Sequence, residues 1–295
     1  MPHQVDEEKA LAEVFIAQPH RPSIAQAINA DTKDLHDTIN VRVVKKFELG
    51  LNDYRLYRQG VISFYHVYEA FERTWAKLLA NPAGVPPHIY AALQALADPR
   101  LSRTPQIAAD LEYFYGAEGF DPKRAPDTPQ RKAVVDYIEK NLTEKPHLLL
   151  AYAHIYYMAL FAGGKILVRM MLAKKDFFPV HKPAGSYEEA QKFGTNMFLF
   201  PVDKGKEEGL RNKFKDAMCE VEGALTEAEK TEIIKEAREI YFWNDRLVDE
   251  LEKICEPMVV PLVIERGHVI FKEHQTKFII FGTFLLFCLF YYCAH

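Results

Sequence analysis

The residues Tyr157-Met-Ala-Leu-Phe-Ala-Gly-Gly-Lys-Ile-Leu167 lie inside a long apolar segment, Leu148 to Leu172, which contains no proline and carries a few charges only in its second half. This length and composition predict a buried helix. The adjacent Gly163 and Gly164 interrupt the pattern, because a glycine in a helix interior costs roughly 1 kcal/mol relative to alanine. The pair predicts a kink or a backbone that another group approaches closely, and a tight crossing of two helices is the alternative.

The rest of the chain predicts an all-α protein of about eight helices, with no convincing strand and no repeat of fixed period. Ser23 with Gln26 forms a capping box that starts a helix extending through Ile39. Thr226 with Glu229 forms a second capping box before another apolar face. The other predicted helices cover residues 54–81, 88–98, 103–116, 128–142 and 206–219, with a connector at 173–186 and an irregular segment at 193–203.

The composition of the chain excludes some classes of function. The 295 residues carry a formal net charge of -4 with a pI of about 6.3, so no basic field indicates a nucleic-acid partner. The four cysteines show neither a CxxC pair nor zinc-site spacing; two lie in an apolar tail, and the others, Cys219 and Cys255, are interpreted as reduced cytosolic thiols. We expect an N-terminal extension at 1–22, a helical domain at 23–256 that ends near Pro257 and Pro261, and a linker at 257–277.

The C-terminal end differs from the rest of the chain. From Phe278 to Ala294 run seventeen residues without a charge, which is at the short end of what crosses a bilayer as a helix. Arg266, Lys272 and Lys277 precede this stretch, so the positive-inside rule leaves the preceding domain in the cytosol. The pattern predicts a transmembrane tail anchor at 278–295, and a buried terminal helix is the alternative.

The candidate site is assembled from four separate features. His36 lies on or beside the apolar face of the first helix, where a hydrogen-bonded core histidine is the alternative interpretation. The run from Phe64 to Trp75 crowds aromatic side chains onto a second helix; the glycine-containing helix and a lysine-rich helix complete the set. No GxSxG, P-loop, HExxH or dinucleotide-binding motif is present. These parts could form a haem site with an axial imidazole, two apolar walls and cations for the propionates.

Several blocks resemble a known family. DTKDLHDTIN (Asp31–Asn40) resembles the proximal helix of the membrane-anchored haem oxygenases, and FYHVYEAFE (Phe64–Glu72) resembles their second helix. DLEYFYG (Asp110–Gly116), GTNMFLFP (Gly194–Pro201) and the helix from Thr226 follow in the family's order. The resemblance covers roughly residues 23–256 and implies a haem-oxygenase-like helical bundle.

The resemblance also implies roles for individual residues. His36 falls on the histidine that ligates haem iron, Tyr68 on a tyrosine that faces the distal side, and Gly163 and Gly164 on the glycines that lie close to the ring. The implied propionate contacts are partly kept: Lys33 and Lys213 match family lysines, His154 stands where a tyrosine is usual, Asn29 stands where a lysine is usual, and Lys215 could replace an arginine that falls on Ala217.

The distal helix departs from the common family pattern. Ala159 and Leu160 occupy the positions of a Gly-Asp pair whose aspartate organises the waters that supply protons. A leucine side chain can neither donate nor accept a hydrogen bond. The segment ALFAGGK (Ala159–Lys165) resembles the fungal branch of the family, which resides at the endoplasmic reticulum and is treated as haem-degrading. The resemblance therefore implies an endoplasmic reticulum location.

Three functions remain open. The first is a haem oxygenase that converts haem to biliverdin, carbon monoxide and ferrous iron, with electrons from an NADPH-cytochrome P450 reductase-type partner. The second is a haem-binding protein without ring opening, such as a buffer, a sensor or a weak peroxidase, and Leu160 favours it. The third is a tail-anchored helical adaptor in which His36 is a core residue.

Overall fold

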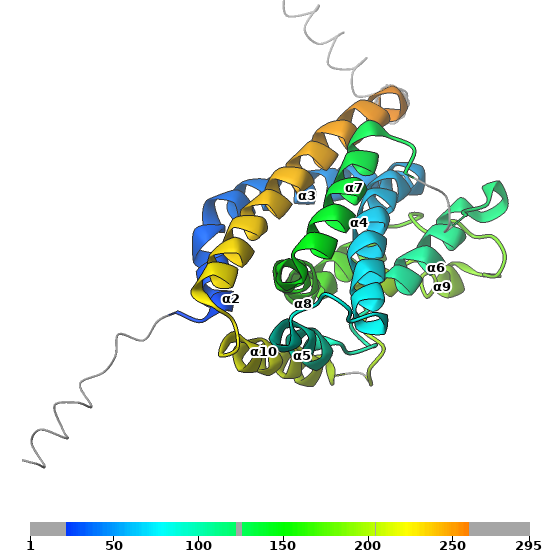
Figure 1. The fold of residues 1–295 in the computed structure, drawn as a ribbon. Helices are drawn as coiled ribbons and strands as arrows, with labels where there is room; N and C mark the ends of the chain where they lie inside the picture. The colour runs from blue at the N-terminus through cyan, green and yellow to red at the C-terminus, as the bar shows by residue number, and fades with distance from the viewer. Residues whose placement is uncertain (1–21, 122–125, 204, 260–295) are drawn as a thin grey trace, which may run out of the picture. The chain divides into compact units, whose positions relative to one another are not determined.

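The computed structural model describes residues 22–121, 126–203 and 205–259. These residues form helices joined by loops and contain no β-strand, as predicted (Figure 1). The chain divides into two units, Met1–Val248 and Asp249–His295, and the candidate site lies in the first. The predicted membrane anchor at 278–295 lies outside the described residues, as do most of the predicted N-terminal extension and linker.

The first helical segment begins where the capping box predicts and breaks within the predicted span. The backbone N–H of Gln26 donates to Ser23 Oγ (3.2 Å), and that of Ser23 donates to Gln26 Oε1 (2.9 Å). Helix α2 (Ile24–Asp31) then ends at Thr32, and α3 (Lys33–Gly50) follows. The Thr32 hydroxyl donates to the carbonyl of Ile28 (2.8 Å), a side-chain bond that competes with the helical ladder and bends helices. The prediction of one unbroken helix was therefore wrong.

Helix α4 (Tyr54–Ala80) is central, and it packs against helices on several sides. Its N-terminus is capped by Asp53, and its aromatic residues are mostly buried, as expected for a core helix. Arg131 from a neighbouring helix is 2% exposed and donates to Ser63 Oγ and to the carbonyl of Gln59 on α4. The surrounding elements are α5 (Pro87–Leu96), α6 (Thr104–Tyr115), η1 (Gly116–Glu118) and α7 (Pro129–Glu144).

Helix α8 (Leu149–Ala173) follows the short turn η2 (Pro146–Leu148) and is helical throughout, including at Gly163 and Gly164. The glycine pair therefore does not interrupt the helix. Within the described residues, Pro146–Ala173 is long and apolar enough to cross a bilayer. Its first half is almost wholly buried among other helices, which is also what a core helix of this composition shows.

The C-terminal part of the described chain supplies the remaining walls. Residues 227–259 form a helix that starts with the predicted capping box, in which Glu229 N donates to Thr226 Oγ1 (3.2 Å). The helix continues past Pro257, beyond its predicted end. Its part up to Val248 runs beside α3 (Figure 1), where Tyr241 meets His36 and Asp245 meets Arg42. Between α8 and this helix come α9 (Tyr187–Ala190), η3 (Asn196–Phe198) and α10 (Glu207–Glu222).

Candidate functional site

His36 lies in the first turn of α3 and presents an imidazole that is 58% exposed. Its Nδ1 is 3.3 Å from Asp37 Oδ1, and Lys33 Nζ is 2.5 Å from Asp37 Oδ2. The hydrogen bonds from Lys33 and then from His36 lower the pKa of Asp37 and keep that carboxylate ionised. When Nδ1–H donates to a carboxylate, Nε2 carries the lone pair, which is the state in which imidazole ligates a metal.

The helix of residues 227–259 supports the same end of α3. The ring of Tyr241 meets the His36 ring edge-on, with centroids 6.3 Å apart and planes at 81°. Six residues after His36 on α3, Arg42 forms an ion pair with Asp245. These contacts fix the position of α3 relative to the helix beside it and so hold the backbone that carries the His36 imidazole.

The two glycines of α8 have different surroundings. A Cβ on Gly164 would lie 3.0 Å from the carbonyl oxygen of Phe198, so the backbone of η3 leaves little room for a side chain there. The buried Asp110 holds η3 in place by accepting from the backbone N–H groups of Asn196 (3.0 Å) and Met197 (2.7 Å). A Cβ on Gly163 would meet nothing within 4 Å. Gly164 thus serves a close structural contact, and Gly163 faces open space.

Gly163 belongs to an open apolar face of α8. Ala159 precedes it by one turn and is exposed, and Ile166 follows it by three residues and is 50% exposed. Residues at this spacing share one side of a helix. A flat apolar group could lie against this face with no side chain between it and the backbone. The imidazole on α3 is a ligand, and this face of α8 is a flat apolar wall, of the kinds that a haem requires.

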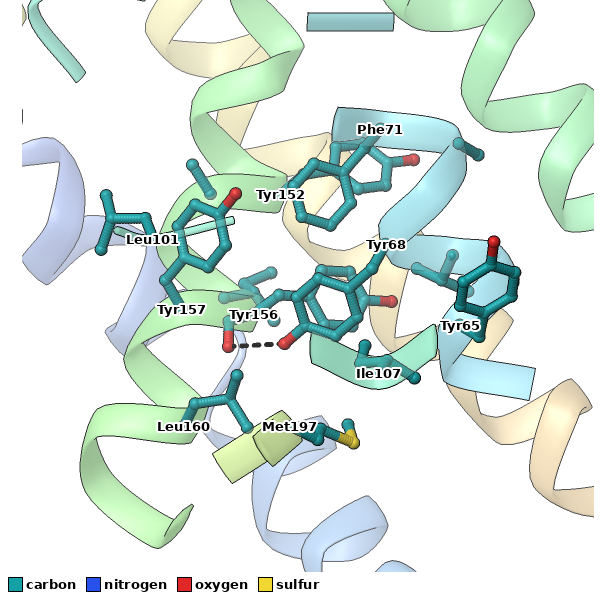
Figure 2. Close-up of a cluster of buried hydrophobic side chains, with 14 of the residues drawn as sticks. Tyr65, Tyr68, Phe71, Leu101, Ile107, Tyr152, Tyr156, Tyr157, Leu160 and Met197 are labelled. Carbon is teal, nitrogen blue, oxygen red and sulfur yellow. Dashed lines mark hydrogen bonds between the residues drawn. The ribbon is translucent and has the colours of Figure 1, made fainter. Parts of the chain in front are cut away.

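Tyr68 and Leu160 lie together at the buried side of α8 (Figure 2). The Tyr68 hydroxyl donates to the carbonyl of Tyr156 (3.1 Å), and the Tyr156 hydroxyl donates to Asn244 Oδ1 (2.8 Å). The Tyr68 hydroxyl therefore uses its one proton in the bond to α8, and its oxygen can still accept a hydrogen bond. Leu160 is 7% exposed and adds no hydrogen-bonding group.

The predicted propionate contacts separate into two groups. Lys213 Nζ lies 3.2 Å from Asp98 Oδ2 and lines an open groove of about 910 Å³ together with Arg100 and Lys206. Lys215, two residues later on α10, is close enough to His154 on α8 to lower the pKa of that imidazole. Lys33 is paired with Asp37 beside His36. Lys215 therefore lies near His154, and Lys33 lies beside His36 through their shared partner Asp37. Lys213 instead faces Asp98.

His154 is a buried neutral histidine. Its Nε2–H donates to Asn29 Oδ1 on α2 (2.9 Å), at 6% exposure. Burial, followed by the positive charge of Lys215, lowers its pKa to about 4. His154 therefore binds a proton near pH 6.5 in the unfolded chain and only near pH 4 in the folded chain. Because the unfolded state binds more protons between these values, the contribution of His154 to the free energy of unfolding is fully present above pH 6.5. That contribution is lost as the pH falls from 6.5 towards 4.

We expect His154→Gln, which can keep a donor toward Asn29, to flatten this pH dependence. Between pH 6.5 and 5 the histidine should remove about 2 kcal/mol from the free energy of unfolding, at about 1.4 kcal/mol per pH unit. Urea unfolding of both proteins at pH 7 and pH 5 measures the difference. An equal loss of stability in the two proteins would contradict the assignment of a depressed pKa to His154.

Several contributors to the site were not identified from the sequence. Asp37 directly follows His36, and an acid beside a candidate ligand histidine is a usable signal. Tyr241 and Asn244 lie on the helix that follows the second capping box, and no pattern in the sequence indicates a role in the site for either of them. Phe198 approaches Gly164 through its backbone, and a backbone contact has no signature in residue type.

Comparison with known proteins identifies relatives over most of the chain. The Heme oxygenase family matches residues 22–250. The chain is 30% identical over 243 residues to "Heme-binding protein HMX1" of Saccharomyces cerevisiae, covering 79% of this chain and 76% of that protein. It is 26% identical over 231 residues to "Heme oxygenase 1" of Nostoc, covering 78% of this chain and 86% of that protein.

Solved structures share the fold. The structure of heme oxygenase-1 from Synechocystis in complex with heme aligns with a TM-score of 0.62 at 24% identity, covering 83% of this chain and 99% of that one. Heme oxygenase-2 from the same organism, in complex with heme and NO, aligns with a TM-score of 0.64 at 22% identity, covering 80% and 88%. At these identities the likeness establishes the helical fold alone.

Proposed function

This chain belongs to the haem oxygenase family, and from that premise we propose that it opens the haem ring to biliverdin with release of carbon monoxide and ferrous iron. Dioxygen is the oxidant, and an NADPH-cytochrome P450 reductase-type partner supplies the electrons. The observation that carries the proposal is the His36 imidazole, whose Nδ1 faces the Asp37 carboxylate and whose Nε2 is left for iron.

Haem, when bound, supplies the redox-active iron and is itself the substrate. His36 would hold the iron through Nε2, and Asp37 orients the imidazole by accepting from Nδ1. The open face at Gly163 would let the backbone of α8 lie against the ring and would exclude water from that side. Lys215 offers a positive charge to a propionate at the α10 edge, where charge-assisted bonds are the stronger kind.

Leu160 cannot take part in proton supply at the distal side, because its side chain forms no hydrogen bonds. Tyr68 Oη has an acceptor lone pair free beside its bond to the Tyr156 carbonyl, and it can hold a water by accepting from it. Backbone carbonyls of α8 are the other acceptors in this part of the site. In this arrangement, the hydroxyl and the helix backbone take over the water-holding task that a distal carboxylate performs in other members.

A second candidate function is haem binding without ring opening. Leu160 favours it, because a distal site lacking a carboxylate controls protons less tightly and would turn peroxide toward peroxidase chemistry. The relative in Saccharomyces cerevisiae also carries the name of a heme-binding protein.

We place the protein at the endoplasmic reticulum membrane, with the helical domain in the cytosol. The uncharged stretch Phe278–Ala294 and the basic residues before it support this location. Fractionation of cells that express the chain with and without residues 278–295 tests it. Membrane association that survives the deletion would overturn the tail anchor.

One experiment separates the three functions. The purified full-length chain in detergent is mixed with hemin, and then reductase and NADPH are added. We expect a Soret band that decays while bilin absorbance appears. A Soret band that persists indicates the haem-binding protein, and the absence of any Soret shift indicates an adaptor.

Replacing Lys215 tests the cation at the propionate edge, and Lys213 provides a matched control on the same helix. We expect Lys215→Ala to weaken hemin affinity by about three- to tenfold, because the ammonium is exposed and its contribution is reduced by solvent. Lys213→Ala should leave the affinity unchanged, because its ammonium faces Asp98. Hemin titration of both variants decides, and a larger effect at Lys213 would reverse the assignment.

A further inference from the structure

Glu236 is a buried carboxylate that joins two tyrosines outside the haem site. It is 5% exposed; its Oε1 accepts from the hydroxyl of Tyr152 (2.7 Å), and its Oε2 accepts from the hydroxyl of Tyr137 (3.0 Å). Burial raises the pKa of Glu236, and burial together with the Glu236 charge raises the pKa values of both phenols. The carboxylate is thus a base placed between two redox-active phenols.

The cluster extends outward to the surface. The ring of Tyr137 and the indole of Trp243 have centroids 5.3 Å apart, and both residues are partly exposed. The guanidinium of Arg246 lies over the indole, 4.7 Å from its centroid. Small solutes can therefore reach the outer pair.

The cluster also extends inward toward His36. Tyr152 and Tyr156, one turn apart on α8, are stacked with centroids 6.3 Å apart at 30°, and both rings lie in the buried cluster of Figure 2. Tyr241 lies close enough to Tyr156 to raise its pKa, and its ring is 6.3 Å from that of His36. Aromatic rings at these separations are in the range of direct ring–ring contact, about 4.5–7 Å.

We propose that Tyr241, Tyr156, Tyr152, Glu236, Tyr137 and Trp243 form a relay that carries single oxidising equivalents from the haem site to the surface, where a soluble thiol removes them. The oxidising equivalents arise when peroxide reacts at the haem-loaded site and ring opening does not follow. The inner end of the relay rests on the proposed function, whereas the outer part, Tyr152 to Trp243, stands on its own contacts.

Each step balances through the shared carboxylate. Tyr152 gives an electron inward through Tyr156 and its phenolic proton to Glu236 Oε1, leaving a neutral tyrosyl radical. Tyr137 then gives its electron to that radical and its proton to Oε2, while Oε1 returns a proton to Tyr152.

At the outer end, Trp243 gives an electron to the Tyr137 radical, and Glu236 returns the proton to Tyr137. The indole loses its N–H proton to water, which the nearby Arg246 charge favours by opposing a radical cation. A thiol restores the indole with a hydrogen atom, and two thiyl radicals combine into a disulfide.

The test of the outer part needs no haem. Pulse radiolysis with azide radical oxidises tryptophan in the haem-free, full-length protein, and transfer to tyrosine appears as loss of indolyl absorbance with gain of tyrosyl absorbance. We expect Tyr137→Phe to remove the fast transfer, and Glu236→Gln to slow it at least tenfold. Trp243→Phe should remove the fast phase, and Trp75→Phe, the matched control at the buried Trp75, should retain it.

A second measurement follows tyrosyl radical by electron paramagnetic resonance after hydrogen peroxide is added to the hemin-loaded protein. Loss of that signal in Tyr152→Phe supports the inner part. Unchanged azide kinetics in both Tyr137→Phe and Glu236→Gln would overturn the relay whether or not the protein degrades haem. Tyr137→Phe keeps the aromatic ring, so it serves as the decisive variant if Glu236→Gln fails to fold.

Discussion

His36→Ala abolishes the histidine-ligated haem spectrum and leaves the helical fold intact. The fold is expected to survive because the imidazole is 58% exposed and bonds only to the neighbouring Asp37 among the described residues, apart from its edge contact with Tyr241. The iron loses its protein ligand because the other histidines with described surroundings are engaged elsewhere, as His154 is with Asn29.

Ferric and ferrous absorption spectra of the hemin complex measure this effect, with circular dichroism as the folding check. His88→Ala is the matched control, since His88 is a partly exposed histidine that pairs with Glu229. Added imidazole should restore a ligated spectrum to His36→Ala. A spectrum that does not change in His36→Ala would remove this residue from the iron.

Leucine at the two glycine positions of α8 should give opposite results. Gly163→Leu has open space and replaces a poor helix former, so the free energy of unfolding should rise by up to about 1 kcal/mol. The new side chain would occupy the face against which we propose that the ring lies, so hemin affinity should fall at least tenfold, or about 1.4 kcal/mol. Gly164→Leu meets the Phe198 carbonyl and should destabilise the fold by about 1–3 kcal/mol.

Urea unfolding of the haem-free proteins and hemin titration together separate the two effects. Gly163→Leu supplies a folded protein with a blocked face, and Gly164→Leu supplies a weakened fold. Tight hemin binding by Gly163→Leu would show that this face of α8 does not contact the ring.

Local signals in the sequence were enough to predict most of the helices. The capping boxes at Ser23 and Thr226 act within one turn, so residue type and spacing reveal them. The break at Thr32 was missed because threonine occurs both in helices and at their ends, and its bond to the Ile28 carbonyl decides between them. Pro257 was expected to end a helix that in fact continues past it.

Single candidate residues of the site could be predicted from the sequence, but the contacts that bring them together could not. The position of His36 followed from the family resemblance, and its role there stays a prediction until iron ligation is measured. The distinction between Gly163 and Gly164 depends on the Phe198 backbone, which is distant in sequence. The division between Lys213 and Lys215 depends likewise on where Asp98 and His154 lie around α10.

Carbon monoxide released per haem in a single turnover tests the central claim most directly. The hemin-loaded, full-length protein receives reductase and NADPH under air, and ferrous myoglobin traps the gas while bilin absorbance is recorded. Ring opening without a distal carboxylate predicts stoichiometric carbon monoxide together with bilin, and a lower yield in Tyr68→Phe at matched haem occupancy. A wild-type complex that keeps its Soret band and releases no carbon monoxide would contradict the haem oxygenase function and leave haem binding in its place.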